Sequence, residues 1–329
     1  MNAKRLFIVI GSLCLIFTMA TLTSGVEAKP IVIKAITVFP MDHPVNKDNQ
    51  PYVDEINKRA KGELRIDYLG GPEVVKTFDQ AEAVRTGRVH LSLFSPFGYL
   101  ESYMPVANAQ GLSQLTPAEE RRSGAYDLWV EVFAKFLNAR YLGRRDAGSP
   151  FALFTNKPIK KLDDLKGMGI RAMPLYEPTL AALGASTMTT PMGDLYTAME
   201  RGVVDGYMSA RPIPPGFALQ EVTKYIMEPP FFQMESCRFM NLDKWKSIPK
   251  HLQDMILDVT AEYETIGLNS ALALDRKALK VFADAGMQTC KLSPEDAKKF
   301  LEIAYGKTWE TVIKKDPEYG PKFKKVLSK

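Results

Sequence analysis

Short strand-like runs alternate with amphipathic stretches between residues 166 and 209. Gly169–Met173 and Ser186–Thr190 have the length of buried strands, and a proline follows each of them. Glu177–Leu183 and Asp194–Arg201 have a helical pattern, and a glycine follows each, as is common at helix ends. A third strand begins after Asp205. This alternation predicts an α/β fold.

Similar patterns occur along the rest of the chain. Residues 63–69 alternate polar and apolar side chains, as expected of a half-buried strand. Apolar residues recur at three- and four-residue spacing over 251–285, which predicts one long helix. Further helices are predicted at residues 46–61, 78–86 and 117–138, and from Pro294 onward with Ser293 as the capping residue. Further strands are predicted at 31–37, 89–94, 222–227, 237–241 and 287–292.

The N-terminus has the pattern of a secretory signal peptide. Met1–Arg5 is basic, Leu6–Ala20 is apolar, and Val26 and Ala28 place small residues before a cleavage site. We expect cleavage after Ala28 and an exported mature protein. An uncleaved N-terminal anchor remains the alternative. Lipidation of Cys14 is not expected, because no small residue precedes it.

Composition is that of a globular protein. The 329 residues are enough for two domains, with 46% hydrophobic and 25% charged residues. Formal net charge is +5, and +4 once Lys4, Arg5 and Glu27 leave with residues 1–28. No basic stripe interleaved with aromatic residues occurs, so a nucleic-acid partner is not expected.

Motifs for catalysis or for a structural metal are absent from the sequence. There is no GxSxG, HExxH, Walker loop or CxxC spacing, so we expect no enzyme, no metal site and no cofactor. Cys237 and Cys290 remain after signal cleavage. In an oxidising compartment they form either a disulfide or two free thiols, and the sequence leaves both open.

Arg171 is the first candidate for ligand binding. It lies near the carboxyl end of the strand predicted at Gly169–Met173, and α/β sheets bind ligands beyond these ends. A guanidinium there matches a carboxylate with two parallel hydrogen bonds. An ordinary salt bridge is the alternative role.

The chain resembles the substrate-binding proteins of TRAP transporters, the tripartite periplasmic uptake systems for organic acids, over nearly all of residues 30–310. The matching segments are Asn156–Ile159, Leu162–Gly167, Ile170-Arg171, Leu183–Ala185, Pro191-Met192, Leu195–Met199 and Gly202–Gly206. The resemblance implies a two-lobed α/β periplasmic binding protein fold, with crossing strands and a long spine helix across both lobes. It also implies that Arg171 binds the substrate carboxylate.

The same resemblance implies the division of the chain and its partners. Residues 29–147 and 236–275 are expected in lobe I, and residues 148–235 and 276–329 in lobe II. The expected partners are a small carboxylate and the membrane subunits of a TRAP permease, and the protein is expected to be a monomer.

Three positions depart from the family pattern. Phe151 stands at the place of a second arginine, Ser209 at an asparagine and Tyr207 at a glutamine. A second carboxylate or several hydroxyls would need polar partners once desolvated. We therefore expect a hydrophobic and aromatic monocarboxylate as ligand, unless Arg211 replaces the missing charge.

Other side chains are expected near the ligand because they follow predicted strands or border loops. These candidates are Phe39, Glu73, Phe94, Met173, Tyr176 and Phe231. Two alternatives stay open: a C4-dicarboxylate or sugar-acid binder of the same family, and a periplasmic ligand sensor for a receptor kinase.

Overall fold

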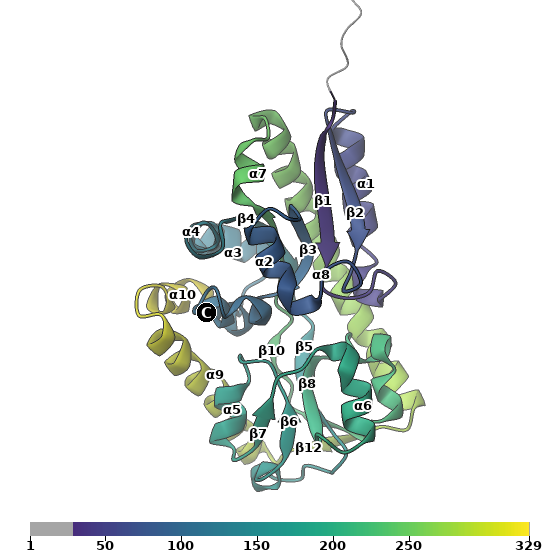
Figure 1. Ribbon diagram of the computed structural model, residues 1–329. Coiled ribbons are helices and arrows are strands. Elements are labelled where there is room, and N and C mark those ends of the chain that lie inside the picture. The colour runs from purple at the N-terminus through teal and green to yellow at the C-terminus, as the bar shows by residue number, and fades with distance from the viewer. Residues whose placement is uncertain (1–28, 329) are drawn as a thin grey trace, which may run out of the picture.

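Two β-sheets, each covered by helices, form the body of the protein in the computed structural model, which describes residues 29–328 (Figure 1). The first sheet has the strand order β2-β1-β3-β11-β4. β1 is parallel to β2 and β3, whereas β11 is antiparallel to β3 and β4. Its strands are β1 (Ile31–Thr37), β2 (Leu64–Gly70), β3 (Leu91–Pro96), β4 (Ala139–Asp146) and β11 (Ser236–Asn241).

The second sheet has the order β12-β9-β5-β8-β6-β7, and β10 pairs with β5. Its strands are β5 (Pro150–Thr155), β6 (Gly169–Arg171), β7 (Ser186–Met188), β8 (Gly206–Ala210), β9 (Tyr225–Glu228), β10 (Phe231–Gln233) and β12 (Gln288–Lys291). β6 is parallel to both β7 and β8, so the carboxyl ends of these three strands meet at one edge.

Helices surround both sheets. The helices of the first half are α1 (Asn49–Arg59), α2 (Gln80–Arg85), α3 (Pro117–Ser123), α4 (Ala125–Leu137), α5 (Glu177–Ala182) and α6 (Leu195–Glu200). Those of the second half are α7 (Leu242–Lys246), α8 (Lys250–Asp284), α9 (Pro294–Lys315) and α10 (Gly320–Leu327). Within residues 29–328, every helix is too short or too polar to span a bilayer.

The chain passes between the two sheets through β4 into β5 and through β10 into β11, and α8 runs alongside both sheets (Figure 1). The backbones of α8 and β4 lie very close: a Cβ at Gly267 would overlap the carbonyl oxygen of Arg145. This close packing fixes the long helix against the crossing strand. The predicted two-lobed fold with crossing strands and a spine helix is confirmed.

Two details differ from the sequence-based expectation. The single helix predicted at 117–138 is broken into α3 and α4 at Gly124, which has the left-handed φ of 87° that glycine adopts readily. α10 packs on α3 and α4, with the ring of Phe323 4.0 Å from that of Trp129, although residues 276–329 were expected in lobe II. The predicted signal peptide lies outside the described residues.

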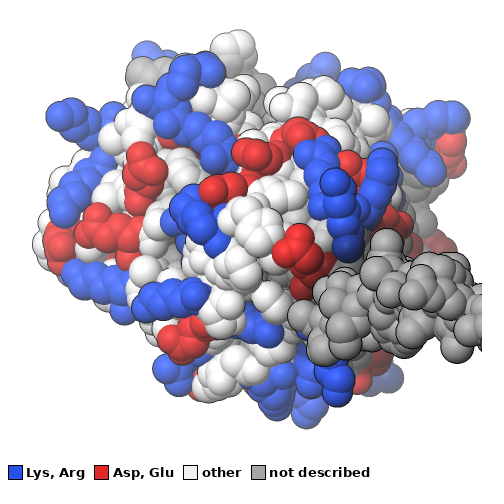
Figure 2. Space-filling view, turned by 90° about the horizontal axis from the view of Figure 1, so that it is seen from above, with Lys and Arg blue, Asp and Glu red and all other residues white. Residues whose placement is uncertain are grey.

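Charged side chains of both signs are interspersed over the face seen in Figure 2. This mixture agrees with the small net charge of the sequence. It gives that face no single-sign field that would steer a polyanion.

The two cysteines within residues 29–328 are free thiols and lie on different sheets. Cys237 is buried in β11 and Cys290 is partly exposed in β12. Of the two states that the sequence left open, the structure has the unbridged one.

Candidate functional site

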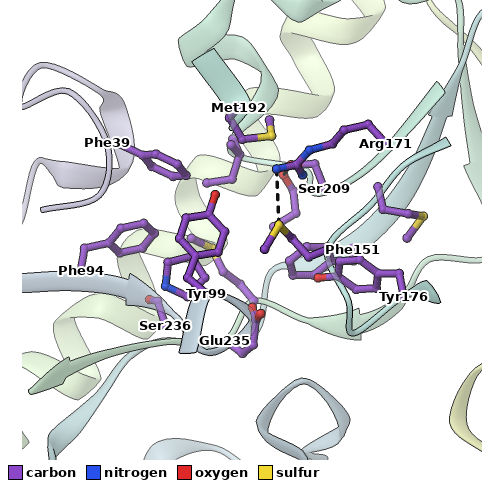
Figure 3. Close-up of a pocket in the computed structure, with 16 residues that line it drawn as sticks. Phe39, Phe94, Tyr99, Phe151, Arg171, Tyr176, Met192, Ser209, Glu235 and Ser236 are labelled. Atoms are coloured by element: carbon purple, nitrogen blue, oxygen red, sulfur yellow. Dashed lines mark hydrogen bonds between the residues drawn. The ribbon is translucent and has the colours of Figure 1, made fainter. Parts of the chain in front are cut away.

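A pocket lies between the two sheets, where the crossing segments meet the ends of β3, β6 and β8 (Figure 3). It encloses about 440 Å³ of empty space, part of it continuous with solvent. The lining residues are Phe39, Phe94, Pro96, Tyr99, Phe151, Arg171, Met173, Tyr176, Met192, Met208, Ser209, Ala210, Ile213, Met234, Glu235 and Ser236.

Arg171 brings a positive charge into this pocket from the last position of β6. Its side chain is only 2% exposed, and its Nε and Nη2 atoms both donate to the carbonyl oxygen of Thr190, at 2.9 and 2.6 Å. Nη2 also lies 3.5 Å from the Sδ atom of Met173. Among residues 29–328, no carboxylate forms an ion pair with this guanidinium. The Thr190 contacts therefore orient the group and leave its charge available to an anionic ligand.

Aromatic rings form much of the remaining wall. The rings of Phe39 and Phe94, from the first sheet, lie 5.2 Å apart. Those of Phe151 and Tyr176, from the second, lie 5.0 Å apart. Both pairs are within the separation at which aromatic rings attract one another. The two halves of the molecule thus each contribute an apolar surface to the same cavity.

Polar groups other than Arg171 are few. Ser209 Oγ donates to the carbonyl oxygen of Ala210 at 3.2 Å, and Ser236 Oγ donates to Asp146 Oδ2 at 2.6 Å. The hydroxyl of Tyr99 lies near Arg171, and burial raises the pKa of Tyr99, so this phenol stays neutral. Each hydroxyl is thereby partly used within the protein.

Glu235 is a buried carboxyl group in the same wall, and the sequence reasoning did not find it. It is 4% exposed, and burial raises its pKa from 4.5 to about 8. Desolvation disfavours the charged form of a carboxyl group, so Glu235 is neutral near pH 7. In the sequence it is one acid in a bend rich in proline and aromatic residues, without a periodic pattern that marks it.

Seven of the ten predicted site residues line the pocket: Phe39, Phe94, Phe151, Arg171, Met173, Tyr176 and Ser209. The other three lie elsewhere. Tyr207 stacks on Phe154 at 4.9 Å, and its hydroxyl accepts from Thr223. Glu73 is exposed and accepts from its neighbour Gly71 N at 2.5 Å, and Phe231 packs on Phe300 at 4.7 Å.

Arg211, the candidate for a second cationic anchor, does not line the pocket. Its Nε and Nη2 atoms donate to Asp275 Oδ1 and Oδ2 at 2.9 and 2.6 Å. Asp275 belongs to α8, so this guanidinium joins the end of β8 to the spine helix. The pocket is therefore lined by one cation, Arg171.

Comparison with known families gives a match over residues 36–315 to the model for bacterial extracellular solute-binding proteins, family 7. This chain belongs to that family. Its members bind solutes and are not enzymes, and the resemblance to TRAP transporter binding proteins is confirmed.

Three curated relatives show the range of this similarity. A solute-binding protein of Albidiferax ferrireducens is 26% identical over 79% of this chain and 78% of its own length. A monocarboxylate 2-oxoacid-binding periplasmic protein of Nostoc sp. is 22% identical over 76% of this chain and 71% of its own length. A C4-dicarboxylate-binding periplasmic protein of Rhodobacter capsulatus is 24% identical over 84% of this chain and 85% of its own length.

A solved structure shares the fold. It is a TRAP periplasmic solute-binding protein from Desulfovibrio salexigens with bound orotic acid, at 22% identity and a TM-score of 0.81. The match covers 90% of this chain and 97% of that chain. The architecture therefore extends across nearly the whole described protein.

Proposed function

We propose that this protein captures a hydrophobic or aromatic monocarboxylate in the periplasm and delivers it, as a monomer, to a TRAP permease. The observation that supports this most is the pairing of one unneutralised guanidinium, Arg171, with a largely aromatic wall. The guanidinium would take the carboxylate in charge-assisted hydrogen bonds. The rings of Phe151 and Tyr176 would take the apolar body of the ligand.

A second charge on the ligand is disfavoured by the pocket composition. Phe151 stands where the family pattern has its second arginine, and Arg211 is held by Asp275. Glu235 adds a buried acid to the wall, and therefore no cation that could neutralise a second carboxylate. A dicarboxylate would thus lose water on one end without gaining a cationic partner.

Relatives support an organic acid but not one class of acid. The Nostoc relative is named for monocarboxylate 2-oxoacids, and the orotic acid in the Desulfovibrio structure is a ring acid with one carboxylate. The Rhodobacter relative is named for C4-dicarboxylates. A dicarboxylate or sugar-acid ligand is therefore the competing proposal, and the pocket lining favours the monocarboxylate.

Thermal-shift measurements with a panel of carboxylates test this proposal. Ligands that bind only the folded state raise the melting temperature. We expect benzoates, phenylpyruvate and branched 2-oxoacids to raise it, and malate, succinate and glucuronate to have little effect. The shifts should vanish in Arg171→Met and persist in Arg211→Met, the matched control. Stabilisation by dicarboxylates or sugar acids alone would overturn the proposal.

A further inference from the structure

Glu235 lies in the short segment that joins β10 to β11, one of the two places where strands cross between the sheets. Its carboxyl group faces the cavity, across from Arg171 (Figure 3). The backbone N–H groups of Glu235 itself and of Gly98 lower the pKa of this carboxyl group, but burial outweighs them. Within residues 29–328 it forms no ion pair. A carboxyl group so deeply buried without an ion pair is costly, and such groups are found preferentially at functional sites.

The charged groups around Glu235 are bound to other partners. Arg144, on β4, donates to Glu120 Oε1 at 2.5 Å and to the carbonyl oxygens of Asp146, Leu115 and Met234. The carboxylate of Asp146 accepts from Arg145 Nη1 at 2.5 Å and from Ser236 Oγ at 2.6 Å. The cation and the anion that influence the pKa of Glu235, Arg144 and Asp146, therefore both have neutralising contacts of their own.

The other titratable neighbours stay uncharged. Burial raises the pKa of Tyr99, and raises those of Tyr176 and Cys237 well above their ordinary values. These groups face Glu235 from the loop after β3, from the N-terminal end of α5 and from β11. None of them supplies a positive charge that would ionise Glu235. Its carboxylic acid proton is therefore available as a hydrogen-bond donor in an apolar cavity.

We infer that Glu235 is the second polar anchor of the site: it donates its acid proton to a neutral acceptor, a carbonyl oxygen or ring nitrogen, at the end of the ligand remote from the carboxylate. This inference rests on the proposed function and narrows it. The ligand class is then a cyclic or aromatic monocarboxylate with an acceptor across the ring. The wall around Glu235 offers no free cation for a second carboxylate, and an ammonium group would instead remove the proton from Glu235.

A matched pair of acids tests the anchor. 4-Acetylbenzoate carries a carbonyl oxygen opposite its carboxylate, and 4-isopropylbenzoate has the same shape without the acceptor. We expect calorimetric titration at pH 7 to show about tenfold tighter binding of the acetyl compound to the wild type, which is the typical effect of one hydrogen bond. Glu235→Gln should keep this preference, because its amide still donates. Glu235→Met should abolish it. Equal affinities in the wild type would overturn the inference.

The pH dependence of binding separates a donor from an ionic partner. If the acid proton is needed, affinity for 4-acetylbenzoate is constant below about pH 8 and falls above it, by up to tenfold per pH unit. Glu235→Gln should show no such fall. Preference for 4-(aminomethyl)benzoate, with affinity that rises between pH 6 and 8, would assign Glu235 to an ammonium group and overturn the inference.

Infrared spectroscopy tests the protonation state without any ligand. The C=O band of a protonated carboxylic acid should disappear between pH 7 and 9 in the wild type and be missing from the spectrum of Glu235→Gln. If the band is already lost at pH 6 as the pH is raised, the inference is overturned even if 4-acetylbenzoate binds. A failure of every monocarboxylate to bind, with this band present, would instead reject the proposed function.

Discussion

Arg211 and Asp275 form a two-pronged ion pair between the end of β8 and the spine helix α8, with N–O distances of 2.9 and 2.6 Å. Both side chains are about one-tenth exposed. The pair commits the guanidinium that would otherwise be the strongest candidate for a second substrate anchor. We therefore expect Arg211 to stabilise the fold and to take no part in recognition of the ligand.

Arg211→Met should lower stability and leave recognition unchanged. Removing one partner leaves Asp275 in a mostly buried site without its cation, so we expect a loss of roughly 2 kcal/mol in the free energy of unfolding. Ligand dissociation constants should stay within about threefold of the wild type, as expected for a residue outside the pocket. Urea denaturation and calorimetric titration measure the two effects. A change in preference toward or away from dicarboxylates would show that Arg211 reaches the ligand.

Phe151→Arg should change the class of acid that binds. The ring of Phe151 lies 5.0 Å from that of Tyr176 in the pocket wall, at the position of the family's second arginine. A guanidinium there would remove an apolar contact and add a partner for a second carboxylate. We expect affinity for aromatic monocarboxylates to fall by about tenfold or more, and succinate or malate to gain affinity. Phe151→Leu is the control, because it removes the ring and adds no charge. An Arg variant that behaves like the Leu variant would contradict the role of Phe151 in excluding dicarboxylates.

Glu235→Gln should alter how stability depends on pH. The native carboxyl has a pKa of about 8, above its ordinary value of 4.5, so the unfolded chain releases the proton first as pH rises. Stability of the wild type therefore falls from about pH 4.5 to pH 8 and then levels off. Between pH 5 and 8 the wild type should lose on the order of 4 kcal/mol in its free energy of unfolding. The glutamine variant should not show this loss, because glutamine does not titrate. Parallel urea denaturation curves at pH 5, 6, 7 and 8 measure this difference. Identical pH profiles would mean that Glu235 ionises at an ordinary pKa.

Gly216→Ala should weaken the contact between the two halves of the protein. His43 Nδ1 accepts from Val45 N at 3.2 Å, which leaves Nε2 as the donor to the carbonyl oxygen of Ile213 at 3.3 Å. A Cβ at residue 216 would overlap the His43 ring. We expect the His43 ring to be displaced. Ligand affinity should then fall by about tenfold, because bringing the two lobes together around the ligand would require more free energy.

Two measurements check the Gly216 prediction. Small-angle scattering with saturating ligand should show a larger radius of gyration for Gly216→Ala than for the wild type. Gly193→Ala is the control, because that glycine has open space at its Cβ position. Unchanged affinity and scattering in Gly216→Ala would show that this contact does not hold the lobes together.

Much of the fold could be predicted because its elements have strong local patterns. The strand predicted at Ile31–Thr37 has the same bounds in the structure, and the long helix predicted at 251–285 is α8, Lys250–Asp284. Ser293 caps α9 by accepting from Asp296 N, with Pro294 at the first position. Each of these rests on periodicity or on capping chemistry within a few residues.

The crossing strand β4 was not predicted because its charged residues look like an exposed loop. Arg144, Arg145 and Asp146 are all less than 5% exposed. Their burial is compensated by distant partners, among them Glu120 and the carbonyl oxygen of Val45. Only the assembled structure brings these partners together, so no local sequence pattern reveals them.

Only part of the site could be predicted, because some of its residues come together only in the folded structure. Arg171 could be placed because it ends a strand that runs parallel to both of its neighbours and matches a family motif. Tyr207 lies on β8 beside Arg171, the last residue of β6. Its ring nevertheless packs on Phe154 and does not line the pocket. Glu235 follows no motif, and its place in the pocket wall arises from the way β10 leads into β11. Which side chains converge on the pocket is thus decided by crossings that are distant in sequence.

A crystal structure with the tightest-binding aromatic monocarboxylate tests the recognition mode most directly. We predict that both carboxylate oxygens lie within hydrogen-bond distance of the Arg171 guanidinium, and that the ring contacts Phe151 and Tyr176. The acceptor at the other end of the ligand should lie against Glu235. A carboxylate bound away from Arg171, or turned toward Glu235, would contradict the proposed recognition of a monocarboxylate by this pocket.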